Sequence, residues 1–178
     1  MPRRLPLALV LLTLLGAACT DEVSPAVPVA VERPLPDLSG PRLDGGGTVD
    51  IAEFEGSPLV VNAWASWCGP CEAETPDLIR LSGEYADEGV RFLGIDHSDQ
   101  TAAGRAFSAR KGTPYPSVED PAGRFAAELG YVGLPATFVV DADGVIRWAI
   151  YGPTDAATVA PLIDDVLGLD ATATPTPG

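Results

Sequence analysis

Two cysteines, Cys68 and Cys71, are separated by one glycine and one proline near the middle of the chain. The apolar run over residues 59–64 predicts a buried strand just before them, and the segment after them predicts a helix. A C-x-x-C pair in the first turn of a helix brings the two sulfur atoms within bonding reach. The free N–H groups and the positive dipole at the start of the helix stabilise a thiolate. Cys68, the outer cysteine, is therefore predicted to be nucleophilic near neutral pH.

The small number of other possible ligands argues against a zinc site. A tetrahedral zinc site needs four ligands, but the chain has three cysteines and one histidine, so only Cys19 and His97 remain. His97 stands in a predicted polar loop, where a lone histidine is expected on the surface with no catalytic partner. A purely structural disulfide between Cys68 and Cys71 would close too short a loop to remove much entropy from the unfolded chain. The pair is therefore predicted to do redox chemistry.

The residues around the cysteines resemble those of the thioredoxin superfamily, through the pentapeptide Trp67-Cys68-Gly69-Pro70-Cys71. The longer stretch over residues 61–76 is similar to the TlpA/ResA branch of extracytoplasmic thiol–disulfide oxidoreductases. Ordinary thioredoxins carry a buried aspartate where this chain has Asn62, which does not titrate. The glutamate that the branch carries three residues after its second cysteine is matched by Glu74.

The resemblance covers residues 38–168 and implies an α/β, thioredoxin-like fold. Its central mixed β-sheet would be flanked by helices, with a central insertion between about Asp99 and Leu129. An alternation of strands and helices is consistent with such a sheet. The apolar pattern predicts strands at 48–51, 59–64, 90–96 and 145–150 and one ending at Asp141, and helices after Cys71 and at 101–111, 120–130 and 159–167.

The resemblance also implies a role for each cysteine. The thiolate of Cys68 would attack a substrate disulfide and form a mixed disulfide, which Cys71 would then resolve. Relatives of this kind reduce disulfides in exported proteins, including apocytochromes c that await haem, and are recharged by a membrane thiol reductase. The dipeptide Gly69-Pro70 matches that of reducing thioredoxins, so we expect a reductase. No cofactor and no metal ion are expected.

Pro135 is the second position at which the resemblance is informative. The matching proline of the superfamily is cis and faces the cysteines across a groove, so the Leu134–Pro135 peptide bond is expected to be cis. The backbone beside it would be free to pair with an extended substrate. Trp67, Gly69 and Pro70 are expected to line this substrate groove together with Leu134 and Pro135.

Three more side chains close to the cysteines have different expected roles. Glu74 is a candidate to accept the proton of Cys71, because i,i+3 spacing places the two on one face of a helix. The alternative for Glu74 is an exposed acid, since acids are common near the start of helices. Glu72 is expected to be an exposed acid, and Trp64 is expected to belong to the core.

Residues 1–18 predict an export signal. Arg3 and Arg4 form a basic region, residues 5–15 are apolar but too few to span a bilayer, and small residues then precede Cys19. This pattern resembles a bacterial lipobox, in which Cys19 is lipidated and anchors the protein to a membrane. The alternative is ordinary signal cleavage with Cys19 left as a free thiol. In both cases the protein is expected outside the cytoplasm, as a cell-membrane lipoprotein or as a secreted or periplasmic protein.

Residues 19–37 are predicted to combine the lipidation site with a semi-rigid, proline-rich tether. The folded domain is expected at 38–168, followed by a disordered tail at 169–178. The net charge is −14 at pH 7 and becomes −16 when residues 1–18, with their two arginines, are removed. Such acidity argues against binding to nucleic acid and against electrostatic binding to membranes.

Two other functions are less consistent with the residues. A thiol peroxidase of the peroxiredoxin kind carries threonine or serine three residues before its reactive cysteine, where this chain has Ala65. A copper-binding chaperone on the same fold uses cysteines spaced by three residues and a distant histidine. Here the spacing between Cys68 and Cys71 is two, and His97 is poorly placed.

Overall fold

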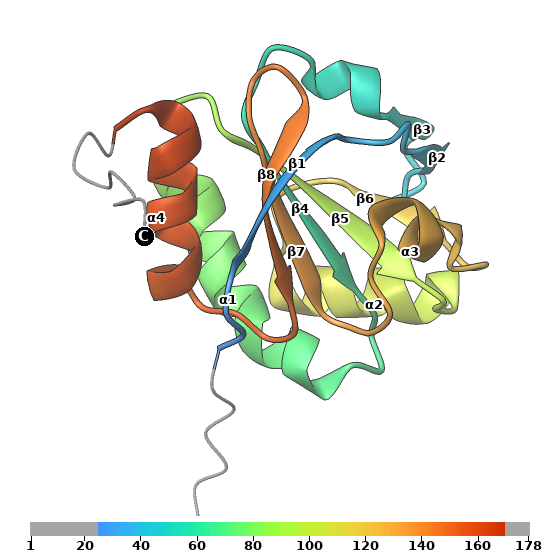
Figure 1. Ribbon diagram of the computed structural model, residues 1–178. Coiled ribbons are helices and arrows are strands. Elements are labelled where there is room, and N and C mark those ends of the chain that lie inside the picture. The colour runs from blue at the N-terminus through green and yellow to red at the C-terminus, as the bar shows by residue number, and fades with distance from the viewer. Residues whose placement is uncertain (1–24, 170–178) are drawn as a thin grey trace, which may run out of the picture.

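The computed structural model describes residues 25–169, which form an α/β fold around a six-stranded mixed sheet (Figure 1). The strand order is β1-β8-β7-β4-β5-β6. Strand β5 pairs in parallel with both β4 and β6, and the other neighbours pair antiparallel. In chain order the elements are β1 (Val29–Pro34), β2 (Ser39–Pro41), β3 (Thr48–Asp50), the 3-10 helix η1 (Ile51–Phe54), β4 (Leu59–Trp64), α1 (Gly69–Glu84), β5 (Arg91–His97), α2 (Thr101–Lys111), β6 (Ser117–Asp120), α3 (Arg124–Leu129), β7 (Ala136–Val140), β8 (Val145–Tyr151) and α4 (Ala156–Leu167).

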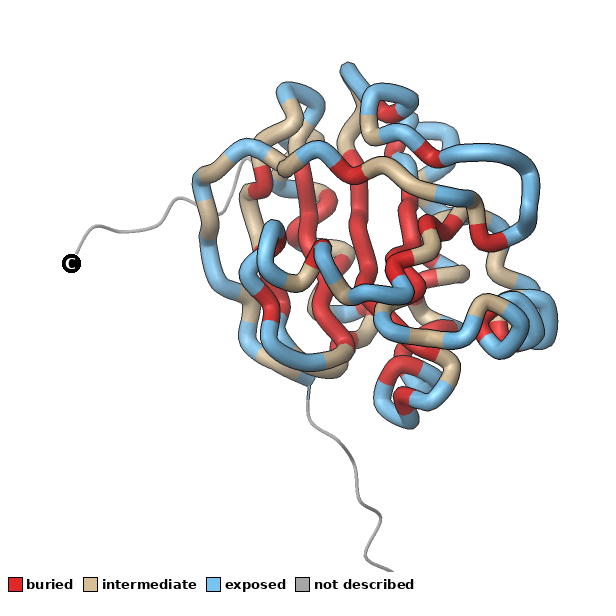
Figure 2. The backbone as a smooth tube through the Cα atoms, turned by 90° about the vertical axis from the view of Figure 1, so that its right-hand side faces the viewer, coloured by how far each residue is buried: buried red, intermediate tan, exposed pale blue. Residues whose placement is uncertain are grey.

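Strand β4 lies in the middle of the sheet, and every one of its residues is buried. Successive side chains of a strand point to opposite faces, so Val60 packs with α1 and α4, whereas Val61 packs with α3 and η1. Figure 2 shows buried residues running along the central strands with exposed residues around them. A strand covered on both faces reads as a continuous apolar run, which is why residues 59–64 could be predicted from sequence.

Strands β4 and β5 are parallel, so their carboxyl ends lie side by side at the same end of the sheet. The turn that leads into α1 follows β4, and the loop that leads into α2 follows β5. In open α/β sheets ligands bind outside the carboxyl ends of the strands. The candidate catalytic residues therefore lie at the carboxyl ends of these strands.

The expected fold class is confirmed, and the expected strand at 59–64 and helix at 101–111 have those bounds in the structure. Residues 99–129, where an insertion was expected, form α2, β6 and α3, and β6 extends the sheet at its edge. A β-hairpin of β2 and β3 is a further addition. It is tied to β6 through a backbone hydrogen bond from Leu43 N–H to the Ser117 carbonyl (2.8 Å).

The prediction of a tether over residues 19–37 is wrong for Val29–Pro34, which form β1 and pair with β8. Val31 and Leu35 pack against the core, and Arg33 donates hydrogen bonds to backbone carbonyls at the end of α3. The folded domain therefore begins upstream of the expected start at residue 38. Prolines are tolerated at the ends of an edge strand because one side of such a strand has no hydrogen-bond partner.

The prediction of a helix over 120–130 placed its start too early. Asp120 ends strand β6, and α3 begins only at Arg124. Asp120 still caps the helix from a distance, because its carboxylate accepts hydrogen bonds from the N–H groups of Arg124 (3.0 Å) and Phe125 (3.1 Å). Asp120 was therefore correctly predicted to cap the helix, but a turn at residues 121–123 separates it from the first helical residue.

The predicted signal peptide, the lipidation site at Cys19 and all of the predicted tail beyond Leu169 lie outside residues 25–169. Among the helices within that range, none has both the length and the apolar content to cross a bilayer.

Candidate active site

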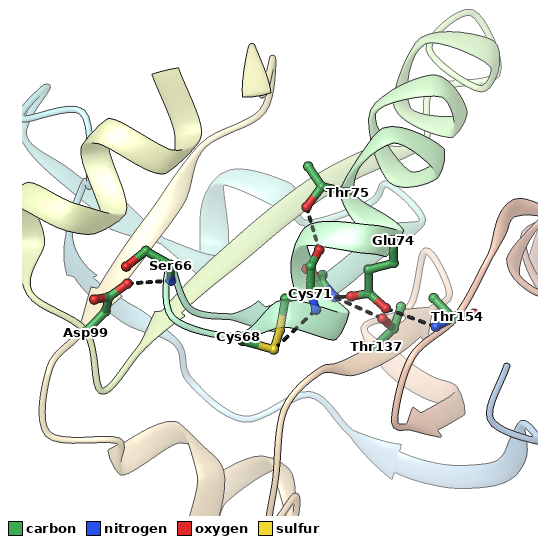
Figure 3. The surroundings of a disulfide bond; sticks show 9 residues. Ser66, Cys68, Cys71, Glu74, Thr75, Asp99, Thr137 and Thr154 are labelled. Carbon is green, nitrogen blue, oxygen red and sulfur yellow. Dashed lines mark hydrogen bonds between the residues drawn. A yellow bond between two sulfur atoms is a disulfide. The ribbon is translucent and has the colours of Figure 1, made fainter. Parts of the chain in front are cut away.

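Cys68 and Cys71 form a disulfide bond at the start of α1, with their Cα atoms 5.2 Å apart (Figure 3). The chain turns sharply after β4, since the Cys68 N–H donates to the Ala65 carbonyl (3.1 Å). Cys68 then caps the helix, and its Sγ accepts a hydrogen bond from the Cys71 N–H (3.2 Å). Pro70 fits this first turn because no helical hydrogen bond is required of its nitrogen. The exposed fraction is 6% for Cys68 and 1% for Cys71, so Cys68 is the more accessible sulfur.

The disulfide packs in a mainly apolar cluster. Trp64 is buried and stacks on Phe107 of α2, with ring centroids 4.9 Å apart, so its expected place in the core is confirmed. Burial in apolar surroundings raises the pKa of a thiol, whereas the start of the helix lowers it. The lowering effect of the helix start acts directly on Cys68, because the Cys71 N–H donates a hydrogen bond to its sulfur. The cluster contains Leu43, Trp64, Ala65, Cys68, Cys71 and Phe107, with Leu134 packed against it.

Glu74 is buried beneath the active-site helix, with 3% of its surface exposed. Its carboxylate accepts hydrogen bonds from Asn62 Nδ2 (2.9 Å) and from the Thr154 N–H (3.0 Å), as Figure 3 shows for Thr154. Burial raises the pKa of Glu74 to about 7, because loss of hydration outweighs the two hydrogen bonds. Glu74 is therefore not the exposed acid of the alternative interpretation. It is a carboxyl group that exchanges a proton near neutral pH.

Glu72 is exposed, as expected, and forms an ion pair with Lys111 of α2 (2.8 Å). The hydrogen bond from Lys111 holds the pKa of Glu72 below its usual value. The two glutamates of α1 therefore differ in chemistry, and Glu72 serves as an internal control for Glu74.

The Leu134–Pro135 peptide bond is cis, as predicted. Leu134 packs against the cluster that contains both cysteines. Gly69 and Pro70 are exposed, and Trp67 has 62% of its surface exposed. The exposed Trp67, Gly69 and Pro70 are close to Cys68 in sequence, and Leu134 contacts the cluster in which Cys68 lies.

His97 does not lie in a loop, and it is not the lone surface residue that was expected. It is the last residue of β5, and its Nδ1 lies 3.0 Å from the hydroxyl of Tyr131 and 3.8 Å from Asp120 Oδ2. Its side chain thus lies between Asp120, at the end of β6, and Tyr131, in the loop after α3. Asp96, its neighbour in the strand, points to the opposite face.

Two anchors of the active-site turn could not be found from the sequence. The Ser66 N–H donates to Asp99 Oδ2 (2.6 Å), and Trp67 Nε1 donates to the Ser98 carbonyl (3.2 Å). Asn62 was singled out in the sequence only because thioredoxins carry an aspartate at that position. In the structure it also donates a hydrogen bond to Thr137 Oγ1 (3.0 Å). These pairs are far apart along the chain, so no local pattern signals them.

A thioredoxin-like sheet with a C-x-x-C disulfide at the start of a helix defines a thiol–disulfide oxidoreductase. Comparison with known proteins agrees with this class. The chain belongs to the Redoxin family, whose model matches residues 30–166, and within it to the thiol:disulfide interchange proteins. It acts through the Cys68–Cys71 pair. This class accounts for the residues better than a peroxidase or a copper chaperone.

The relatives and the structural neighbours carry consistent names. A thiol:disulfide interchange protein DsbE from Allochromatium vinosum is 37% identical over 139 residues, which are 77% of this chain and 75% of the relative. The thiol:disulfide interchange protein HelX of Rhodobacter capsulatus is 36% identical over 114 residues, or 64% and 62% of the two chains. The crystal structure of a secreted thiol-disulfide isomerase from Corynebacterium glutamicum has a TM-score of 0.74 at 27% identity, with 80% and 92% of the two chains covered.

Proposed function

We propose that the protein is a reductase of disulfides in exported proteins and that it acts outside the cytoplasm. The observation that carries the direction of electron flow is the apolar packing of Leu43, Trp64 and Phe107 around the disulfide. A disulfide is neutral, whereas a thiolate loses hydration in such surroundings. This cost is greatest at Cys71, the more buried cysteine, although the start of the helix stabilises the thiolate of Cys68. A couple whose reduced form is not stabilised has a low reduction potential. Its dithiol therefore passes electrons readily to other disulfides.

The reaction starts from the dithiol form. The Cys68 thiolate attacks one sulfur of the substrate disulfide, the substrate S–S bond breaks, and the released substrate thiolate takes up a proton. A mixed disulfide then joins the substrate to Cys68. The Cys71 thiolate attacks Cys68 Sγ, which releases the second substrate sulfur and leaves the Cys68–Cys71 disulfide. Two electrons have then passed to the substrate.

Glu74 is the proton acceptor for Cys71 in this scheme. Cys71 is buried, so its thiol loses a proton reluctantly unless a base is close by. Glu74 stands three residues further along α1, is itself buried, and has a pKa raised by burial to about 7. A base with a pKa near the working pH is the most effective proton acceptor. Asn62 supports this role by holding one carboxylate oxygen in place.

The substrate groove consists of Trp67, Gly69, Pro70, Leu134 and Pro135. An extended segment of the substrate would lie along the backbone before the cis proline, since main-chain pairing gives affinity with little sequence preference. The exposed indole of Trp67 would form the opposite wall.

The names of the relatives support protein thiols and disulfides as the substrates. The resemblance to the TlpA/ResA branch further implies apocytochromes c, whose paired cysteines must be reduced before haem is attached. Each turnover leaves the enzyme oxidised, so a membrane thiol reductase would have to recharge it. Two structural neighbours described as secreted support a location outside the cytoplasm.

A redox titration tests the proposed direction. We expect the Cys68–Cys71 couple to titrate below roughly −200 mV, on the thioredoxin side of the scale. Equilibration with glutathione or dithiothreitol buffers, followed by alkylation of free thiols and mass spectrometry, measures this potential. A value near roughly −120 mV would instead identify an oxidase of dithiols.

A lipid anchor on Cys19 is the second part of the proposal. It is supported by the small residues that precede Cys19 after a basic and apolar segment. Stable anchoring needs two acyl chains, which a diacylglyceryl cysteine supplies. In a bacterium that lipidates exported proteins, we expect the wild type in the membrane fraction and the Cys19→Ala variant in the soluble fraction. An N-terminus found unmodified by mass spectrometry would contradict the anchor.

A further inference from the structure

The turn that carries Cys68 is held from the side by the loop after β5. Ser66 and Trp67 are the two central residues of this turn. The Ser66 N–H bonds to Asp99 Oδ2 at 2.6 Å, a contact drawn in Figure 3, and the Trp67 indole bonds to the Ser98 carbonyl. The position of the Cys68 sulfur therefore depends on where Asp99 lies.

A second carboxyl group lies behind Asp99. Asp96, on β5, has 3% of its surface exposed, and no group within residues 25–169 is hydrogen-bonded to its Oδ1. Its carboxyl lies against that of Asp99, and hydrogen bonding with Asp99 is one cause that raises the pKa of Asp96. The Oδ1 atom of Asp99 accepts from the Gln100 N–H (2.7 Å). Two carboxyl groups can share a hydrogen bond only when one of them is protonated.

Asp96 cannot turn away from Asp99 without disturbing the fold. The strand register places it between Trp64 of β4 and Glu119 of β6. Helix α2 can pack closely over Asp96 because residue 104 is a glycine, and a Cβ there would overlap Asp96 Oδ2. The glycine is thus required for the carboxyl group to fit between sheet and helix.

The charges around Asp96 favour its protonated form. Glu119 is already paired, with Thr101 Oγ1 at 2.9 Å and with the guanidinium of Arg105 at 3.3 Å. Lost hydration, then the charge and hydrogen bond of Asp99, then the charge of Glu119, raise the pKa of Asp96 to about 8.

The remaining titratable neighbours do not supply a compensating charge. His97 points to the opposite face of the sheet, toward Tyr131 and Asp120. The cysteines carry no charge while they are joined in the disulfide, and they lie with Trp64 in the apolar cluster. In the part of the chain that the structure describes, no cation forms an ion pair with Asp96.

We propose that Asp96 is a positioning residue of the active site: its carboxyl proton, donated to Asp99, keeps Asp99 on the Ser66 N–H and so fixes the turn before Cys68. When Asp96 loses this proton, two adjacent carboxylates repel each other. Asp99 is half-buried and can move into solvent. The Ser66 N–H then loses its acceptor, and the turn is released.

The test follows the Ser66 amide by NMR in the oxidised protein, in which neither cysteine titrates. This readout does not depend on the direction of electron flow, so it can fail while the proposed reductase activity stands. In the wild type we expect the Ser66 amide shift to titrate with a midpoint near pH 8, the pKa of Asp96. Protection of this amide from hydrogen exchange, corrected for the intrinsic rate, should fall about tenfold or more, as for loss of one charge-assisted hydrogen bond.

Asp96→Asn is the informative variant, because an amide can donate to Asp99 but does not ionise. We expect it to abolish the Ser66 transition and to retain protection at high pH. Glu74→Gln is the control for a buried carboxyl group elsewhere in the fold, and it should leave the transition in place. A wild-type Ser66 amide that does not titrate, or a transition that persists in Asp96→Asn, would overturn the proposal. If Asp96→Asn does not fold, direct carboxyl ¹³C titration of Asp96 in the wild type decides, since a midpoint near 4 would also overturn it.

Discussion

Cys68→Ala is expected to lower the rate of disulfide reduction by on the order of 10³-fold or more, because the variant has lost the attacking sulfur. The measurement is turnover of a generic protein disulfide with excess dithiol as the electron source. Cys71 is too buried to replace Cys68, with 1% of its surface exposed against 6%. The Cys19→Ala variant is the matched control and should retain full activity, since Cys19 takes no part in the exchange.

Cys71→Ser is expected to give a different defect. Cys68 can still attack, but nothing resolves the mixed disulfide, so the substrate should stay covalently attached. Non-reducing electrophoresis and mass spectrometry of cell extracts would identify the attached proteins and so name the physiological substrates. Full activity of the Cys68→Ala variant would contradict the assignment of the two cysteines.

Glu74→Gln is expected to slow turnover about 10²-fold or more, the usual effect of losing a general base. In the wild type, turnover should fall as pH drops below about 7, because Glu74 then becomes protonated and cannot accept the proton of Cys71. The variant should be slow and should lack this dependence. Glu72→Gln is the matched control, because Glu72 is exposed and paired with Lys111. If Glu74→Gln kept the wild-type pH–rate profile, Glu74 would not be the proton acceptor.

The same carboxyl group should affect stability. The pKa of Glu74 rises from 4.5 to about 7 on folding, so the folded protein holds its proton over a range where the unfolded chain has lost it. The stability from this group is therefore full below about pH 4.5 and is lost as pH rises to about 7. This rise in pKa corresponds to about 3 kcal/mol.

Denaturant unfolding of the oxidised protein at acid and neutral pH measures this effect. The Glu74→Gln variant should have near wild-type stability at acid pH, where both side chains are neutral. It should lose less stability than the wild type as pH rises, and the difference between the two curves isolates Glu74 from other titrating groups. Parallel curves for the two proteins would show that folding does not raise the pKa of Glu74.

Features that depend on neighbouring residues could be predicted from the sequence. The strand at 59–64 reads as one apolar run because both its faces are covered, and the start of α1 is marked by Pro70 after a capping residue. The helix at 101–111 ends at Gly112, which has a left-handed backbone conformation. Such signals lie in neighbouring residues, so they can be recognised without knowledge of the fold.

The two edge strands of the sheet, β1 and β6, were not predicted. Val29–Pro34 reads as a tether because its prolines interrupt any periodicity, yet β8 supplies the partner that makes it a strand. Strand β6 has only four residues and includes Glu119, so it carries no apolar run of its own. Its place is set by the parallel pairing with β5.

The sequence by itself determined the class of chemistry, because a C-x-x-C pair at a helix start needs only adjacent residues. The tertiary structure decided how that chemistry is tuned. Glu74 and Glu72 look alike in the sequence, and only the packing of α1 on β4 buries the first and exposes the second. Asp96 and Asp99 can anchor Ser66 only because the parallel strands β4 and β5 end side by side. The physical reason is that burial and distant hydrogen bonds set a pKa, and both come from residues far apart in the chain.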